Sequence, residues 1–185
     1  MRIISGELKG KKIELPKDKL TRPLRDMVKE SIFNIILHSQ IINFKLEDCI
    51  VLDLFSGSGS FGLECISRGV KHVHFYENYL GALEVLKKNI DNLKCKDQCT
   101  IIEKSCFELD KYFKKSANII FLDPPFKEVK INQLLELILE KNFLDKDGII
   151  IIHRKRNNHE DFLDKFKVLE TRNYGVSKII FGTRF

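Results

Sequence analysis

From residue 49 onward, short apolar runs alternate with longer segments whose apolar residues recur every three or four positions. The short runs predict β-strands, and the longer segments predict amphipathic α-helices with one face to bury. We predict strands near 50–54, 73–76, 100–103, 118–122 and 148–153, and helices near 60–68, 79–92, 106–114, 128–141 and 158–165. This alternation indicates a parallel sheet with helices on both faces.

The C-terminal residues depart from this alternation. Segments 167–173 and 177–185 both have strand patterns, and only Tyr174, Gly175 and Val176 separate them. No helix fits between them, so the two strands must pair antiparallel as a hairpin. The predicted fold is therefore α/β, with a mostly parallel seven-stranded sheet and a C-terminal antiparallel hairpin. This is the Rossmann-like fold of methyltransferases that use S-adenosylmethionine (SAM).

The first residues form a different kind of segment. Residues 1–22 contain two glycines and a proline among alternating apolar and basic positions, which predicts a small strand-and-turn extension outside the core. A helical pattern then begins at Pro23 and continues to about His38. We therefore divide the chain into a basic N-terminal extension, 1–22, and a methyltransferase domain, 23–185.

The chain has 185 residues, which suits one compact domain with a modest extension. Its net charge is +6, and residues 1–30 hold nine basic and five acidic residues, so most of the excess is N-terminal. A basic segment on a nearly balanced body is expected of a protein that binds a polyanion such as RNA, although a solvated lysine-rich surface has the same composition.

Composition also limits the compartment and the chemistry. The five cysteines show no CxxC spacing, which favours reduced thiols in the cytoplasm. His72 and His74 lack a third ligand nearby in sequence, so we expect no metal site. The apolar runs are too short to span a membrane. We expect a cytoplasmic monomer.

A glycine-rich loop follows the first predicted strand. Gly57, Gly59 and Gly62 match G-x-G-x-x-G between a strand and a helix, and Glu77 ends the next strand. Such a loop lets the backbone approach a nucleotide, and the acidic side chain accepts hydrogen bonds from ribose hydroxyls. NAD and SAM both carry that ribose. The short chain, the hairpin and the loop after the fourth strand favour SAM.

That loop has the sequence Asp123-Pro124-Pro125-Phe126. An exocyclic amine on a base is a poor nucleophile until acceptors draw its protons, and Asp123 and the Pro124 carbonyl suit that task. The prolines fix φ, and Phe126 offers a face on which an extruded base can stack. An ordinary Pro-Pro turn with a buried phenylalanine is the alternative interpretation.

With these motifs, the chain resembles the bacterial 16S ribosomal RNA guanine-N2 methyltransferases of the RsmD family over nearly its whole length. The resemblance rests on Met1–Gly6, Thr21–Asn34, Val51–Gly59, Gly62–Gly69 and Phe121–Phe126. It implies transfer of a methyl group from SAM to the N2 of a guanine in 16S rRNA, either as RNA or within a small-subunit assembly intermediate.

The residues that we expect to act form three groups. The catalytic group is Asp123, Pro124, Pro125 and Phe126. The cofactor-binding group is Asp53, Phe55, Ser56, Gly57, Gly59, Glu77, Asn78, Ser105 and Cys106. The RNA-binding group is Arg2, Lys9, Lys11, Lys12, Arg22 and Arg25.

The chain departs from the family pattern at three positions. Phe126 stands where the family usually has tyrosine, and Ser105 stands where an acidic residue commonly follows the third strand. His153 ends the fifth strand in place of a frequent glutamate, and Arg154-Lys155-Arg156 follows it. That basic run either touches RNA or is a solvated strand end.

Two other functions fit the motifs. One is a methyltransferase for another planar amine, in DNA adenine or cytosine or in protein glutamine. The other is a non-catalytic RNA-binding assembly module that keeps SAM as a structural ligand.

Overall fold

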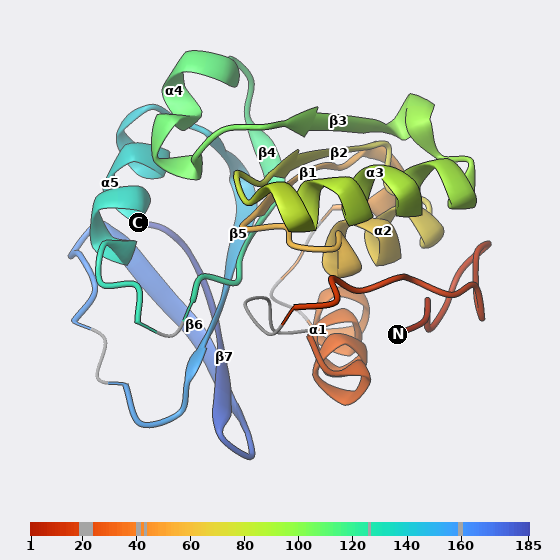
Figure 1. Cartoon of the computed structure of the whole chain (residues 1–185). Coiled ribbons are helices and arrows are strands. Elements are labelled where there is room, and N and C mark those ends of the chain that lie inside the picture. Colours follow the sequence, from red (N-terminus) through yellow and green to blue (C-terminus); the bar gives the residue numbers. More distant parts are fainter. Residues whose placement is uncertain (19–23, 40–41, 43, 126, 159–160) are drawn as a thin grey trace.

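The computed structural model describes residues 1–18, 24–39, 42, 44–125, 127–158 and 161–185. Seven strands form one sheet in the order β3-β2-β1-β4-β5-β7-β6 (Figure 1). Strands β1 to β5 pair parallel with their neighbours, whereas β7 pairs antiparallel with both β5 and β6. The strands are β1 (Ile50–Leu54), β2 (His72–Tyr76), β3 (Cys99–Ile102), β4 (Ala117–Leu122), β5 (Leu144–Lys155), β6 (Phe166–Tyr174) and β7 (Ser177–Arg184). The predicted parallel sheet and C-terminal hairpin are confirmed.

Helices cover both faces of the sheet, as the alternating pattern predicted. They are α1 (Asp26–His38), α2 (Ser60–Ser67), α3 (Leu80–Leu93), α4 (Leu109–Tyr112) and α5 (Ile131–Glu140), with short 3-10 turns η1 (Leu46–Asp48), η2 (Lys96–Gln98) and η3 (Cys106–Glu108). Successive residues of each central strand point to opposite faces. The strand side chains on one face of the sheet pack with α1, α2 and α3, and those on the other face pack with α4 and α5.

Two predicted helices differ from the structure. The segment 106–114 contains η3 and a single turn of α-helix in α4 instead of one continuous helix. The segment 158–165 shows no helix at 161–165, and residues 159 and 160 lie outside the described part. The side-chain amide of Asn132 donates to the Asp161 carbonyl at 2.6 Å, and Phe162 packs against Phe166. The connection is therefore fixed by contacts to α5 and β6 rather than by helical hydrogen bonds.

The N-terminal segment also differs in part from its prediction. Arg2 and Lys12 form an antiparallel bridge, in agreement with a strand-and-turn extension. However, Ile3 and Ile13 are each only 1% exposed and belong to the core beneath α1 and α2. The expectation that this segment stays outside the core is wrong, because its two apolar side chains bury themselves against the domain. The predicted helix start at Pro23 lies outside the described residues, and α1 begins at Asp26.

Candidate active site

The carboxyl ends of β1, β2 and β4 lie side by side. Leu54 of β1 is in register with Tyr76 of β2 and Leu122 of β4, so the loops after these strands start at one edge of the sheet. The strand order reverses direction between β1 and β4, and open α/β sheets bind ligands at such a point. The topology therefore brings the glycine loop, Glu77 and Asp123 together, as predicted.

The glycine loop bends through left-handed backbone conformations. Gly59, the residue before α2, has φ +81°, and a Cβ at that position would lie 2.5 Å from the Leu86 side chain. A Cβ at Gly62 would lie 2.3 Å from the Phe75 ring. Both positions require glycine, because any side chain would separate α2 from α3 or from β2. The close packing explains the spacing of the motif without reference to a ligand.

Glu77 ties the end of β2 to the glycine loop. One carboxylate oxygen accepts from the Gly57 N–H at 2.8 Å, and the other accepts from the Asn78 and Tyr79 N–H groups at 2.8 Å each. These amides fix the orientation of a half-buried carboxylate. Since a carboxylate has about four acceptor positions, one more donor such as a ribose hydroxyl can be accommodated. Among the described residues, apart from the chain neighbours of Gly57, no atom lies within 4 Å of where a Cβ on Gly57 would be, so this point of the loop borders open space.

Asp53 lies beneath the loop at 1% exposure, where its carboxylate accepts from the Gly62 N–H at 3.0 Å. Burial raises the pKa of Asp53 well above its usual range; the Gly62 N–H opposes that shift, and the charges of Asp123 and Glu77 add to it. The contact holds the first turn of α2 in place. That Asp53 also faces the cofactor stays a prediction.

The other predicted cofactor residues lie on the segments that follow β1, β2 and β3. Phe55 packs edge-on against Phe107, and the buried Ser56 hydroxyl donates to the Tyr76 carbonyl at 3.1 Å. Asn78 is exposed at the start of the next loop. Ser105 caps η3 by accepting from the Phe107 N–H at 3.3 Å. Cys106 is buried, and its burial raises the pKa of the thiol to about 12, so it is a packing residue rather than a nucleophile.

Asp123 has a partner on the neighbouring strand. Its Oδ1 lies 2.8 Å from Nδ1 of His153, which ends the apolar part of β5 and is 3% exposed. From the sequence, His153 is recognised only as a histidine at a position where the family frequently has glutamate. Because Leu122 is in register with Ile152, the next residue of each strand must be a neighbour, so the strand alignment was the signal that could have found this contact.

The rest of the proline loop is held at both ends. Pro124 is buried and Pro125 is exposed, while Phe126 lies outside the described residues. Arg154, directly after His153, is 4% exposed and donates from Nη2 to the Glu128 carbonyl at 2.9 Å. Strand β5 therefore contacts this loop at two places, through His153 at Asp123 and through Arg154 at Glu128.

Comparison with known proteins connects this geometry to a family. The family described as Conserved hypothetical protein 95 matches residues 1–183. The chain belongs to this family. Putative rRNA methyltransferase YlbH of Bacillus subtilis is 36% identical over 159 residues, covering 84% of this chain and 83% of its own. Ribosomal RNA small subunit methyltransferase D of Haemophilus influenzae is 31% identical over 179 residues, covering 95% and 90%.

Solved structures agree with the fold. The putative methyltransferase yhhF from Escherichia coli superposes with a TM-score of 0.82 at 25% identity, covering 100% of this chain and 97% of that one. The putative methylase HI0767 from Haemophilus influenzae gives 0.78 at 28% identity, covering 100% and 98%. The Rossmann-like methyltransferase fold and the resemblance to the RsmD family are thus confirmed.

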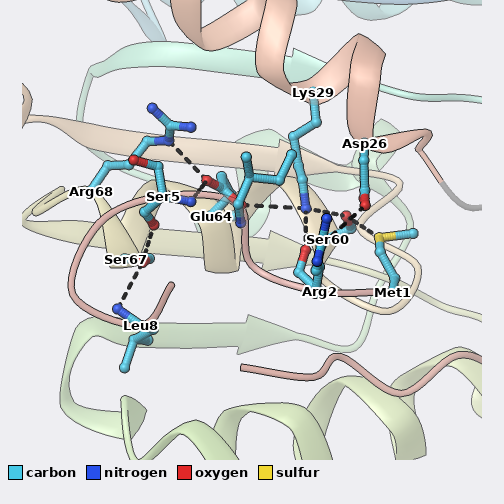
Figure 2. A network of polar contacts seen from close by, with 12 residues as sticks. Met1, Arg2, Ser5, Leu8, Asp26, Lys29, Ser60, Glu64, Ser67 and Arg68 are labelled. Atoms are coloured by element: carbon cyan, nitrogen blue, oxygen red, sulfur yellow. Dashed lines mark hydrogen bonds and ion pairs between the residues drawn. The ribbon is translucent and has the colours of Figure 1, made fainter. Parts of the chain in front are cut away.

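A buried polar network fastens the N-terminal segment to the glycine-loop helix (Figure 2). The Glu64 carboxylate, in α2, accepts from the N–H groups of Ile4 at 2.8 Å and Ser5 at 3.0 Å, and from Nε of Arg68 at 2.9 Å. Lys29 of α1 lies 3.4 Å from the same carboxylate and donates to the Arg2 carbonyl at 3.0 Å. Both Lys29 and Glu64 side chains are 0% exposed. Sequence reasoning missed this network, because neither residue belongs to a nucleotide or catalytic motif.

Five of the six predicted RNA-binding residues lie on the surface of the described part of the chain. Lys9, Lys11, Lys12 and Arg25 are exposed, and Arg2 is exposed with its guanidinium 3.9 Å from Asp26. Arg22 lies outside the described residues. Within the described residues, no three His, Cys, Asp or Glu side chains are grouped so as to hold a metal ion. None of the helices found there is long and apolar enough to cross a membrane.

Proposed function

We propose that the protein transfers a methyl group from SAM to the exocyclic N2 of a guanine in small-subunit rRNA. The observation that carries this proposal is the placement of Asp123-Pro124-Pro125 beside the Glu77-anchored glycine loop, at neighbouring strand ends. The relatives named as rRNA methyltransferases support RNA as the substrate.

The residues at the sheet edge fit SAM. The oriented Glu77 carboxylate suits a ribose, and the loop at Gly57 borders open space. Asp53, Phe55, Ser56, Gly59, Asn78, Ser105 and Cys106 complete the proposed cofactor side. When bound, SAM supplies an electrophilic methyl group on a sulfonium.

The chain's own residues then act on the amine. His153 holds Oδ1 of Asp123 at 2.8 Å, which orients the carboxylate toward the strand end. Asp123 and the Pro124 carbonyl accept the amine protons, so the nitrogen lone pair turns toward the methyl group. Positive charge develops on the nitrogen during transfer, and the Asp123 carboxylate stabilises it and can take the released proton. The Phe126 ring stacks on the base.

RNA is held outside this acidic centre. We assign the phosphate contacts to Arg2, Lys9, Lys11, Lys12 and Arg22, in a basic extension of residues 1–22, and to Arg25 at the start of the domain of residues 23–185. Each such contact releases counterions, so RNA binding should weaken steeply with salt. The protein would act in the cytoplasm as a monomer, on 16S rRNA or on an assembly intermediate of the small subunit.

Nucleoside mass spectrometry tests the proposal. Small-subunit rRNA from cells that lack the protein should lose N2-methylguanosine, and the wild-type gene should restore it. Asp123→Asn should fail to restore it, whereas Asp97→Asn, on the exposed turn η2, should restore it fully. Loss of a methyl group from another base or from a protein would redirect the substrate assignment. Undiminished methylation would favour the non-catalytic module.

A further inference from the structure

The carboxyl end of β5 and the C-terminal hairpin carry a row of polar and basic side chains. Lys178 of β7 is in register with Arg154 of β5 on one side and with Asn173 of β6 on the other. Cross-strand partners project to the same face of a sheet. Arg156 directly follows the end of β5, and its backbone N–H contacts the Val176 carbonyl in the turn between β6 and β7. Figure 1 shows the hairpin β6–β7 extending past the other strands beside the end of β5.

These strand ends line an open, shallow hollow of about 350 Å³. Its lining consists of Arg156, Asn157, Asn158, Asn173 and Lys178, which are two cations and three amides without a carboxylate or an apolar side chain. Cationic and amide donors are the groups that recognise phosphate oxygens. The composition of the hollow therefore fits a phosphate group better than an apolar ligand.

The positive charge in the hollow is not neutralised by the part of the chain that the structure describes. Lys178 donates to the Asn158 carbonyl, a neutral acceptor, and the Arg156 N–H donates to the Val176 carbonyl at 2.8 Å. Among the described residues, no carboxylate forms an ion pair with Arg156 or Lys178. Like charges on adjacent strands destabilise a sheet, and a bound anion relieves that repulsion.

The hollow is close to the candidate active site. His153, which contacts Asp123, lies three residues before Arg156, a separation of roughly 10 Å along an extended chain. The centre of the site is acidic, because the carboxylates of Glu77 and Asp123 lie near each other around the buried Asp53. Phosphates are repelled from such a centre, so an RNA strand that presents a base to Asp123 must place its backbone on basic flanks.

We propose that this hollow binds a backbone phosphate of the RNA strand next to the target nucleotide. The inference rests on the proposed function, and it adds a second RNA contact besides those of the N-terminal extension. Arg156 and Lys178 supply the charge. Asn158 and Asn173 supply neutral donors that position the phosphate.

The test uses Arg156→Gln and Lys178→Gln, singly and together, with transcribed small-subunit rRNA as the probe. A matched control is Lys71→Gln/Lys96→Gln, which removes two exposed charges at the opposite, amino edge of the sheet. Arg156 is exposed, so its single variant keeps the fold even if Lys178→Gln does not. Thermal unfolding and SAM titration monitor each variant.

We expect the double variant to reduce the log–log salt dependence of rRNA binding by roughly 0.7–0.9 for each lost phosphate contact, with SAM affinity unchanged. The control should keep the wild-type slope. If Arg156→Gln and the control lose RNA affinity equally, the hollow has no specific role and the inference is overturned. If the wild-type protein neither binds nor methylates rRNA, the proposed function itself fails, which is a separate result.

Discussion

The buried pair Lys29–Glu64 predicts an asymmetric response to substitution. In Glu64→Gln, the Lys29 ammonium keeps only neutral acceptors, the Arg2 carbonyl at 3.0 Å and the Ser60 hydroxyl at 3.5 Å, and remains fully buried. Removing one partner of a buried ion pair costs about 3–5 kcal/mol. Burial already lowers the pKa of Lys29, and Glu64 is the main group that opposes this. Deprotonation limits the Lys29 part of this cost to about 4.6 kcal/mol, the free energy of neutralising an ordinary lysine at about pH 7.

Lys29→Met should cost less. The Glu64 carboxylate then still accepts from the N–H groups of Ile4 and Ser5 and from Arg68, so its charge remains compensated. We expect a loss of about 1–3 kcal/mol, the value of the lost charged hydrogen bonds. Against a typical domain stability of about 5–15 kcal/mol, the difference between the two variants is large enough to measure.

Urea denaturation followed by circular dichroism measures the free energy of unfolding of both variants. Glu14→Gln is the control, because the Glu14–Lys88 ion pair is exposed and its loss should cost no more than about 1 kcal/mol. In Glu64→Gln, hydrogen exchange should speed up most at the amides of Ile4 and Ser5, which donate to the Glu64 carboxylate in the wild-type protein. A Glu64→Gln protein as stable as the control variant would refute the reasoning that this network fastens the N-terminal segment.

Four further outcomes are expected. Glu77→Ala should weaken SAM binding by about 1.5–3 kcal/mol in titration calorimetry, and an unchanged affinity would remove Glu77 from the cofactor site. Asp123→Asn should slow single-turnover methylation of rRNA by about 10²–10³ while SAM and RNA affinities stay close to wild type; an unaltered rate would exclude Asp123 from the chemistry. Gly62→Ala should destabilise the fold by about 1–3 kcal/mol in urea denaturation, because the added Cβ meets the Phe75 ring, and wild-type stability would show that α2 can shift. Burial, and to a smaller extent the charges of His72 and Lys115, lower the pKa of His74 to about 4. Between pH 6.5 and 4 the unfolded chain therefore binds more protons than the folded protein, so the free energy of unfolding falls as the pH falls through that range. The decrease in the free energy of unfolding should be smaller in His74→Gln than in the wild-type protein. An equal pH dependence in the two proteins would contradict this prediction.

The sequence alone determined the sheet and its order of elements. Apolar runs of strand length and amphipathic helices are local patterns, and the three residues between 173 and 177 permit only a hairpin. The loops that carry Glu77 and Asp123 follow from those patterns, because the carboxyl ends of parallel neighbours lie at one edge. The prediction was wrong for the helix at 158–165, where Asn132 and Phe166 fix the chain by contacts from elsewhere in the sequence.

Only the tertiary structure decided how residues from distant parts of the chain contact one another. The ion pair of Lys29 with Glu64, the burial of Ile3 and Ile13, and the contact of His153 with Asp123 each join separate elements. No periodicity in the sequence records such contacts, because they depend on the register between strands and on which helix face is buried. A lysine or a glutamate in an amphipathic helix is normally assigned to solvent. Its burial follows only when a second chain segment supplies the opposite charge and the hydrogen bonds that compensate for lost water.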